Sequence, residues 1–325
     1  MFTINCNPLR YILVKSRFFT ILLLILSGRS FLYAQYDPSF SHYFDMETSF
    51  NAASAGKDEK LNVVGAYALA LAGFENNPKT MYLSADMPFY ALKSYHGVGI
   101  QLVNDQIGLF THQRVNLQYD YKFALFGGTL SAGVTAGFIN ESFDFSKVDV
   151  EDSSDPAFQS SDNNGSGFDL GVGLYYKRKD WYVGISAQHV NAPLIEIGEK
   201  NELQIDATYY LTAGCNIRMR NPFLTIKPSL LVRSDGVGYR GDVTGRLVYT
   251  NDNKMMYGGV SYSPTNSVTF LIGGNVHGIV LGYSYEVYTS AISAGNGSHE
   301  LFVGYQTDIN LVKKGRNRHQ SVRIL

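Results

Sequence analysis

Alternation with a period of two residues runs through most of this chain and limits what it can fold into. In FDLGVGLYYKRKDWYVGIS (168–186), two segments flank a charged turn, and apolar side chains take every second position. These side chains are Phe168, Leu170, Val172, Leu174 and Tyr176, and then Trp181, Val183 and Ile185. Successive side chains of a β-strand point to opposite faces, so each segment predicts a strand with one apolar face and one small or polar face. The apolar face must meet either a protein core or lipid.

The same period predicts about fourteen strands and no other extended element. The segments are 61–74, 79–88, 95–107, 110–125, 127–145, 166–178, 180–192, 203–219, 223–235, 238–250, 253–262, 265–275, 277–288 and 297–308. An even number of antiparallel strands is what a bacterial single-chain membrane barrel requires. After residue 34, no apolar run is long enough for a transmembrane helix.

The lengths of the connections separate a membrane barrel from a soluble sandwich. If the first strand leaves from the periplasm, the periplasmic turns are short, and the long connections 146–165, 191–202 and 289–298 all fall on the outer side. Outer-membrane barrels have this asymmetry, whereas a β-sandwich has no reason to sort its loops by parity. The fold expected is therefore an all-β, antiparallel transmembrane barrel over residues 61–308, with its apolar face against outer-membrane lipid.

Composition agrees with this fold. Charged residues make up 17% of the chain, against about 25% in soluble domains. There are 23 Tyr, 20 Phe and 32 Gly, and aromatic side chains gather near segment ends, as they do in the interfacial girdles of barrels. The formal net charge of −1 implies no general attraction to nucleic acid.

The N-terminus predicts export. Arg10, Lys15 and Arg17 form a basic region, the apolar run 18–26 follows, and Ala34 offers a small residue before cleavage. This run fits a cleaved signal peptide, residues 1–34, better than the alternative of a retained anchor helix. Removal of Cys6 with the signal would leave Cys215 alone, so no intramolecular disulfide is expected.

Residues 35–60 and 309–325 lie outside the strand pattern. In the first segment, Phe40, Tyr43, Phe44, Glu47 and Phe50 recur at three- and four-residue steps, which predicts one short amphipathic helix or an irregular segment. We expect its aromatic side chains, Phe40, Tyr43, Phe44 and Phe50, to pack inside the barrel, to cross its periplasmic mouth or to mark a partner contact. A flexible periplasmic leader is the alternative.

The C-terminal segment carries the cations Lys313, Lys314, Arg316, Arg318 and Arg323. An even barrel that starts in the periplasm also ends there, so these residues would form a basic periplasmic arm. One interpretation is a docking arm for an acidic partner. The other is a solvated tail that salt screens.

Patterns that would carry chemistry are weak. The paired glycines of GVGIQL and GVGLYY lack the strand-to-helix context of a nucleotide site, and no cluster has metal-ligand spacing. Ser298 and Glu300 of the GSHE stretch (297–300) would share one strand face, with His299 on the other. That arrangement does not place a nucleophile beside its base. We therefore expect no catalytic residue, cofactor or metal.

Several stretches resemble the PorP/SprF family, outer-membrane proteins of the Bacteroidota type IX secretion system. They are YYLTAGCNI (209–217), IKPSLLVRSDG (226–236), GVSYSP (259–264), LGYSYEVYTSAISAGNGSHELFVGY (281–305), KKGRNRHQSVRIL (313–325) and the opening QYDPSFSHYFDMETSFNAASAG (35–56). The stretch Gly297, Ser298, His299 and Glu300 and the C-terminal ending are the most specific. The family usually has Pro after the Asn of an Asn-Pro-Ala-like element, whereas here Ala52 follows Asn51.

The resemblance implies a non-catalytic outer-membrane protein. Such a protein supports the export or surface attachment of cargo such as adhesins, or anchors the periplasmic secretion and gliding machinery. Its partners would be type IX components in the periplasm or a secreted surface protein. The alternative function is a passive porin or a channel for hydrophobic solutes, and a barrel enzyme is a third reading.

Overall fold

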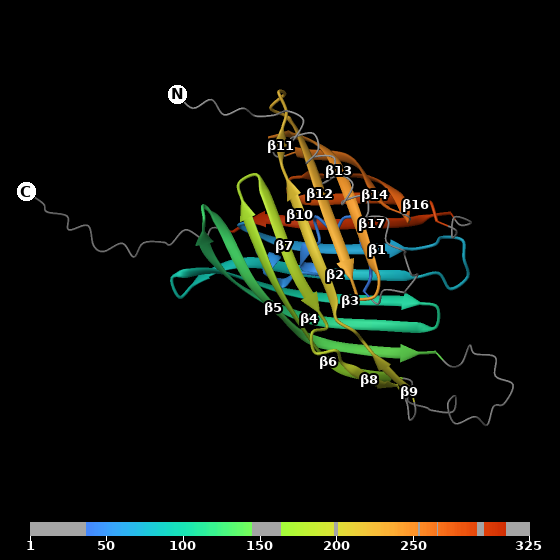
Figure 1. Cartoon of the computed structure of the whole chain (residues 1–325). Coiled ribbons are helices and arrows are strands. Elements are labelled where there is room, and N and C mark those ends of the chain that lie inside the picture. The colour runs from blue at the N-terminus through green and yellow to red at the C-terminus, as the bar shows by residue number, and fades with distance from the viewer. Residues whose placement is uncertain are drawn as a thin grey trace, which may run out of the picture. The chain divides into compact units, whose positions relative to one another are not determined.

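The strands of the computed structural model pair side by side into one sheet that closes on itself (Figure 1). The structure describes residues 37–144, 164–197, 201–252, 254–264, 266–290 and 296–309. The barrel strands are β1 (Lys60–Leu69), β2 (Lys79–Ala91), β3 (Ser94–Ile107), β4 (Phe110–Leu125), β5 (Gly128–Phe143), β6 (Asn164–Arg178), β7 (Trp181–Gln188), β10 (Thr208–Cys215), β12 (Leu224–Ser234), β13 (Tyr239–Asn251), β14 (Lys254–Ser263), β15 (Ser267–Val276), β16 (Ile279–Tyr288) and β17 (Ser298–Asp308). A two-residue strand, β11 (Ile217–Arg218), extends the edge beside β12.

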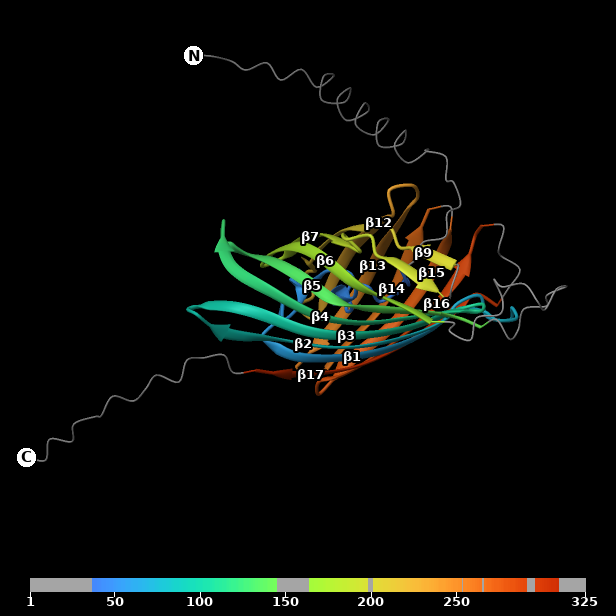
Figure 2. The same ribbon diagram turned by 90° about the horizontal axis from the view of Figure 1, so that it is seen from below.

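Two pairings close the barrel. The first strand, β1, lies beside the last, β17 (Figure 2). The two are antiparallel, with Val64 opposite Gly304. On the far side β10 bridges β7 and β12. Lipid offers no hydrogen-bond partner to an open sheet edge, so closure is what allows a sheet to span a bilayer. The predicted all-β, antiparallel barrel of fourteen strands is confirmed.

Strand ends differ from the prediction where the backbone leaves the extended region. The strand expected over 61–74 ends at Leu69, because Leu71 and Gly73 have φ of 50° and 98°. The strand expected over 203–219 was too long at its N-terminal end. Residues 201–204 belong instead to a hairpin, β8 (Leu194–Ile197) with β9 (Asn201–Gln204). At the other end β10 stops at Cys215, and β11 continues its pairing with β12 in the same register to Arg218.

The β8–β9 hairpin lies in the long connection after β7 and packs onto the inner face of β5 and β6. Ile195 and Ile139 are both fully buried and share an apolar cluster with Ile197 and Ile205. Gly165 of β6 makes room for it, since a Cβ there would lie 2.6 Å from the Ile195 side chain. The connection is therefore folded onto the wall of the barrel.

Connections sort by the end of the barrel at which they lie. Tight two-residue turns, 92–93, 126–127, 179–180 and 277–278, join strands at one end. The four longest connections, 70–78, 144–163, 189–207 and 289–297, lie at the other end, which also holds the short connections 108–109, 235–238 and 264–266. Outer-membrane barrels have short periplasmic turns and longer outer loops, so the short-turn end is the periplasmic end.

Burial is inverted relative to a soluble domain. In β4, Leu117 is 62% exposed on the outside, while its neighbours Asn116 and Gln118 are 0% and 4% exposed on the inside. On the apolar faces of β7, β16 and β17, Ile185, Leu281 and Val303 are 51%, 53% and 44% exposed, and Val183 is partly exposed. The apolar face therefore points outward.

Among the described residues, no helix is long and apolar enough to cross a membrane.

Arginine in place of Ile185, near the middle of β7, should lower the free energy of unfolding by about 2–4 kcal/mol, the cost of a charge on the lipid face near the bilayer midplane. Denaturant unfolding in lipid vesicles measures this change. The matched control is Val237→Arg in the loop between β12 and β13, where the side chain is 65% exposed and the change should stay within about 0.5 kcal/mol. Equal effects at the two positions would contradict the lipid assignment.

Candidate functional site in the barrel lumen

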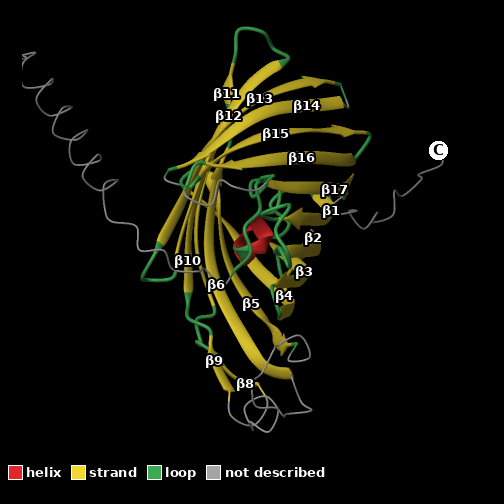
Figure 3. Ribbon diagram, turned by 90° about the vertical axis from the view of Figure 1, so that its right-hand side faces the viewer, coloured by secondary structure: helices red, strands yellow, loops and turns green. Residues whose placement is uncertain are grey.

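Residues 37–59, which we call the plug, run inside the barrel before β1 begins (Figure 3). Inward side chains of the wall hold the plug backbone. Gln118 of β4 donates to the Thr48 carbonyl at 2.7 Å, and Ser186 of β7 donates to the Phe50 carbonyl at 2.7 Å. A polar inner wall gives a polar backbone the partners it needs, so the plug is stable without regular secondary structure.

The plug is irregular, with two short 3₁₀ turns in place of the helix that its aromatic spacing also allowed. The turns are η1 (Glu47–Ser49) and η2 (Ala52–Ser54). Asn51 caps η2, since its side-chain oxygen accepts from the Ala53 amide at 3.0 Å. Asparagine is a favoured residue at this position because its short side chain reaches the free amides of the first turn.

The first and last of the four predicted aromatic residues pack on tyrosines of the wall. Phe40 is 7% exposed and lies 5.2 Å, centroid to centroid, from Tyr82 of β2. Phe50 is 5% exposed and stacks on Tyr210 of β10 at 5.4 Å. Offset aromatic pairs of this kind add to the burial of apolar area.

Tyr43 and Phe44 pack against β12, β13 and β14, in the same apolar cluster as Phe50 and Tyr210. The Tyr43 hydroxyl lies 2.9 Å from Ser229 Oγ of β12 and donates to Thr244 Oγ1 of β13 at 3.0 Å. Phe44 carries the Arg246 guanidinium on its ring face, 3.3 Å from the centroid, an arrangement that favours the cation. All four aromatic side chains are thus buried inside the barrel, and whether they contact a partner stays a prediction.

The GSHE stretch ties the plug to the last strand. Glu300 points inward and accepts from the Ser41 and His42 amides at 2.6 and 3.1 Å and from His42 Nδ1 at 2.6 Å. Ser298 shares this inward face, and its hydroxyl accepts from the Leu71 amide at 3.0 Å. His299 points the other way and meets the Tyr283 hydroxyl at 2.7 Å. The alternation predicted for these three side chains is therefore observed.

Gly297, the first residue of this stretch, has φ of 77°, and a Cβ there would lie 2.8 Å from the Tyr285 ring. Glycine is the residue that adopts this backbone conformation at no steric cost.

Asp37 anchors the N-terminal end of the plug. Its carboxylate accepts from Arg114 Nη1 at 2.7 Å and from the Tyr210 hydroxyl at 2.7 Å, and it lies 3.2 Å from His189 Nε2. Burial alone would raise the pKa of Asp37, but His189 and Arg114 outweigh that effect and hold the pKa well below its usual value. Burial opposes the charge of His189 as well, yet Asp37 and Asp169 raise the pKa of the imidazole to about 9. The cluster therefore stays charged and paired at neutral pH.

Inward glycines let the plug backbone touch the wall. A Cβ on Gly133 of β5 would lie 2.6 Å from Ala53 Cα and 2.7 Å from the Ala52 carbonyl carbon. On Gly282 of β16 it would lie 2.8 Å from His42 Nε2. Each contact leaves no space for a side chain, so glycine at these two positions lets the plug pack directly against the inner wall.

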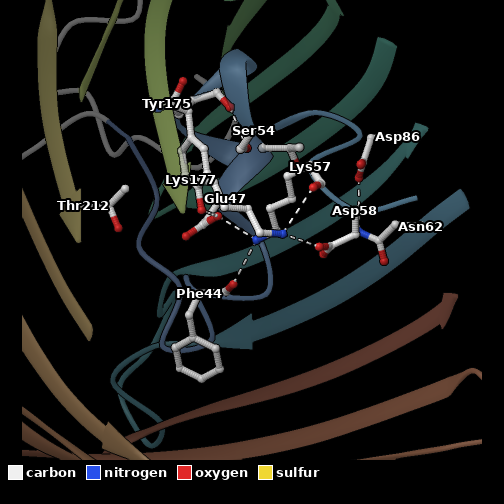
Figure 4. A network of polar contacts seen from close by, with 12 residues as sticks. Phe44, Glu47, Ser54, Lys57, Asp58, Asn62, Asp86, Tyr175, Lys177 and Thr212 are labelled. Atoms are coloured by element: carbon white, nitrogen blue, oxygen red, sulfur yellow. Dashed lines mark hydrogen bonds and ion pairs between the residues drawn. The ribbon is translucent and has the colours of Figure 1, made fainter. Parts of the chain in front are cut away.

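A network of ion pairs and hydrogen bonds holds the plug at the periplasmic end (Figure 4). Lys57 Nζ donates to Glu47 Oε2 at 2.6 Å, and the Tyr175 hydroxyl donates to the same oxygen at 3.0 Å. Burial disfavours charged Lys57, but the carboxylates of Glu47 and Asp58 outweigh it and raise the pKa of Lys57. Lys177 Nζ donates to Asp58 at 2.6 Å. Glu47 is 2% exposed, so this pairing supplies the partners that a buried carboxylate requires.

The remaining predicted site residues, Lys313, Lys314, Arg316, Arg318 and Arg323, lie outside the described residues, as does the predicted signal peptide. Sequence reasoning missed the residues that hold the plug at its two ends, above all Asp37, Arg114 and Lys57. A usable signal existed for Arg114, because a charge at a small-or-polar position of a strand points into the lumen. Within the described ranges, no group of three or more His, Cys, Asp and Glu side chains is placed to hold a metal ion.

Fold and site together define an outer-membrane β-barrel whose lumen is occupied by its own N-terminal segment. The family model of the type IX secretion system membrane protein PorP/SprF matches residues 32–305. The chain therefore belongs to the PorP/SprF family, and the resemblance noted in its sequence is confirmed. No curated protein sequence matches it significantly.

Solved structures with similar folds are outer-membrane channels and porins. The CymD monoaromatic hydrocarbon channel is 12% identical, with a TM-score of 0.49 over 87% of this chain and 94% of that one. A deletion mutant of the TodX monoaromatic hydrocarbon channel is 10% identical, with a TM-score of 0.42 over 77% and 89%. A mutant of the Rh. blastica porin is 10% identical, with a TM-score of 0.31 over 76% and 99%. Nothing about function follows from matches this distant.

Valine in place of Gly133 should displace the plug, because its Cβ has no space beside η2. The released segment should become sensitive to trypsin after Lys57, as N-terminal sequencing of the digested barrel would detect. Gly245→Val on β13 is the control, since nothing lies within 4 Å of a Cβ there. If both variants resist trypsin as the wild type does, the close approach of plug and wall at Gly133 is wrong.

Proposed function

We propose that this protein is a non-catalytic component of the type IX secretion system that acts by protein–protein contact at its periplasmic end. It sits in the outer membrane, as its family and barrel fold indicate. In this role it supports the export or surface attachment of cargo such as adhesins, or it anchors the periplasmic machinery of secretion and gliding.

The filled lumen is the observation that carries the proposal. Side chains of β2, β4, β6, β7, β10, β12, β13 and β17 bond to the plug. These strands lie all around the barrel. A passive channel needs an open, water-filled passage between the ends of the barrel, and a segment bonded to the wall on all sides opposes that function.

The contact surface we propose lies at the periplasmic end. The turn between β6 and β7 is basic, and Arg178 and Lys179 are both exposed there. The predicted basic arm, 309–325, follows the last strand at this end, because β17 runs toward the short turns. Two cationic features on one end favour an acidic partner and faster association with it.

Deletion of residues 36–56 should open the barrel, because it removes nearly all of the plug while leaving each strand. Planar-bilayer recordings should show a closed wild-type protein and a conducting deletion variant. A wild-type protein that conducts as steadily as a porin would favour the channel function. A deletion variant that stays closed would contradict the lumenal plug.

Truncation after Val312 tests the periplasmic contact, because every strand remains while the basic arm is removed. The truncated protein should insert normally, which heat-modifiable migration checks. It should lose co-purification with type IX components from native envelopes, or lose secretion of its cargo. Normal insertion together with wild-type co-purification and secretion would show that the arm does not dock a partner.

A further inference from the structure

A cavity of about 270 Å³ lies beside the plug at the periplasmic end of the lumen. Asn216, Lys227 and Arg246 border it on the β10–β13 side, and Lys57 and Lys177 border it on the other. The volume is below that of ordinary small-molecule sites, which run from about 300 Å³ upward. It suits one or two side chains of a polypeptide.

Three of the five cations around this cavity already have carboxylate partners. Lys57 pairs with Glu47 and Lys177 with Asp58, each at 2.6 Å. Lys60 lies 3.7 Å from Asp308. Their charges are balanced within the protein.

Lys227 and Arg246 are different. They stand directly opposite each other on β12 and β13, both on the inner face. Among the described residues, no carboxylate lies within ion-pair distance of either one, although Asp45 and Asp86 also line the cavity. Like charges opposite each other in a sheet are destabilising, so this pair lacks the counter-charge that would stabilise it.

The plug fixes the orientation of Arg246. Its guanidinium carbon lies over the Phe44 ring, 3.3 Å from the centroid, and its Nε is buried without a hydrogen-bond partner. A guanidinium presents a planar fork of N–H donors that matches a carboxylate. Lys227 supplies a second positive charge beside it.

We propose that Lys227 and Arg246 bind an acidic side chain from an extended segment of a periplasmic protein partner. The inference rests on the proposed function, which places a protein contact at this end of the barrel, and it adds the chemistry of the recognised segment. A glutamate or aspartate supplies the missing negative charge and fits the cavity, and the plug residue Phe44 forms part of its site.

Fluorescence anisotropy on the purified full-length barrel tests the assignment. The probe is a dye-labelled Gly-Ser-Glu-Glu-Ser-Gly peptide with blocked ends, and the matched probe has Gln in place of both Glu residues. The Glu peptide should bind more tightly than the Gln peptide. Lys227→Gln and Arg246→Gln should each weaken that binding about tenfold, the loss expected for one charge-assisted hydrogen bond.

Arg218→Gln is the control, because Arg218 is an exposed cation at the same end and does not line the cavity. Its binding should equal that of the wild type. Equal binding of the Glu and Gln peptides, equal losses in the three variants, or full displacement by inorganic phosphate at the peptide's concentration would overturn the assignment. Truncation after Val312 leaves the cavity intact. If the truncated protein still binds the peptide and its co-purification with type IX components is unchanged, the hypothesis of a docking arm is wrong, whereas the acidic-segment site is not contradicted.

Discussion

Hydrocarbon offers no hydrogen-bond partner, and the whole architecture follows from that constraint. A sheet in lipid must close so that no strand edge is left unpaired, and the pairing of β1 with β17 achieves this. Closure then separates two faces, an apolar one toward lipid and a polar one toward the lumen. Buried polar groups need partners too, and much of the inner wall finds them in residues 37–59.

The plug is therefore an integral part of the barrel, because it supplies hydrogen-bond and ion-pair partners to the inner wall. At one end Asp37 meets Arg114 and Tyr210, and at the other Glu47 meets Lys57 and Tyr175. The Asp37–Arg114 ion pair joins the plug to the wall. Breaking a buried ion pair by removing one partner costs about 3–5 kcal/mol, so this contact resists loss of the plug. Glu300 adds a link between the start of the described chain and the last strand, which is itself half of the closing seam. Glu300 therefore couples the packing of the plug in the lumen to the strand pairing that closes the barrel.

The strands could be predicted from the sequence because one face of each strand meets lipid and the other meets the lumen. Apolar residues must therefore alternate with small or polar ones. The same rule placed Ser298 and Glu300 on one face and His299 on the other. Partners inside the lumen could not be assigned from the sequence. Asp37 and Arg114 are 77 residues apart, and His42 and Glu300 are 258 apart, so their meeting depends on the strand register and on the path of the plug. The 3₁₀ turns could not be predicted from the sequence either, because contacts with the wall and its inward glycines determine the path of the plug.

The hairpin in the connection after β7 was missed for a related reason. Residues 194–204 alternate weakly, so their sequence indicates a loop and the start of a strand, whereas the space above Gly165 lets Ile195 fold onto the wall. That space is provided by β6 in the folded barrel, so the sequence of residues 194–204 alone does not reveal it.

Hydrogen–deuterium exchange of the amides in residues 46–56, recorded on the protein in outer-membrane vesicles, tests most directly whether the lumen is filled in the membrane. Bonded plug amides such as those of Ser49, Asn51 and Ala55 should exchange slowly, on the timescale of the barrel strands. Exchange as fast as in an unstructured peptide would show that the segment is a free leader and would contradict the plugged barrel.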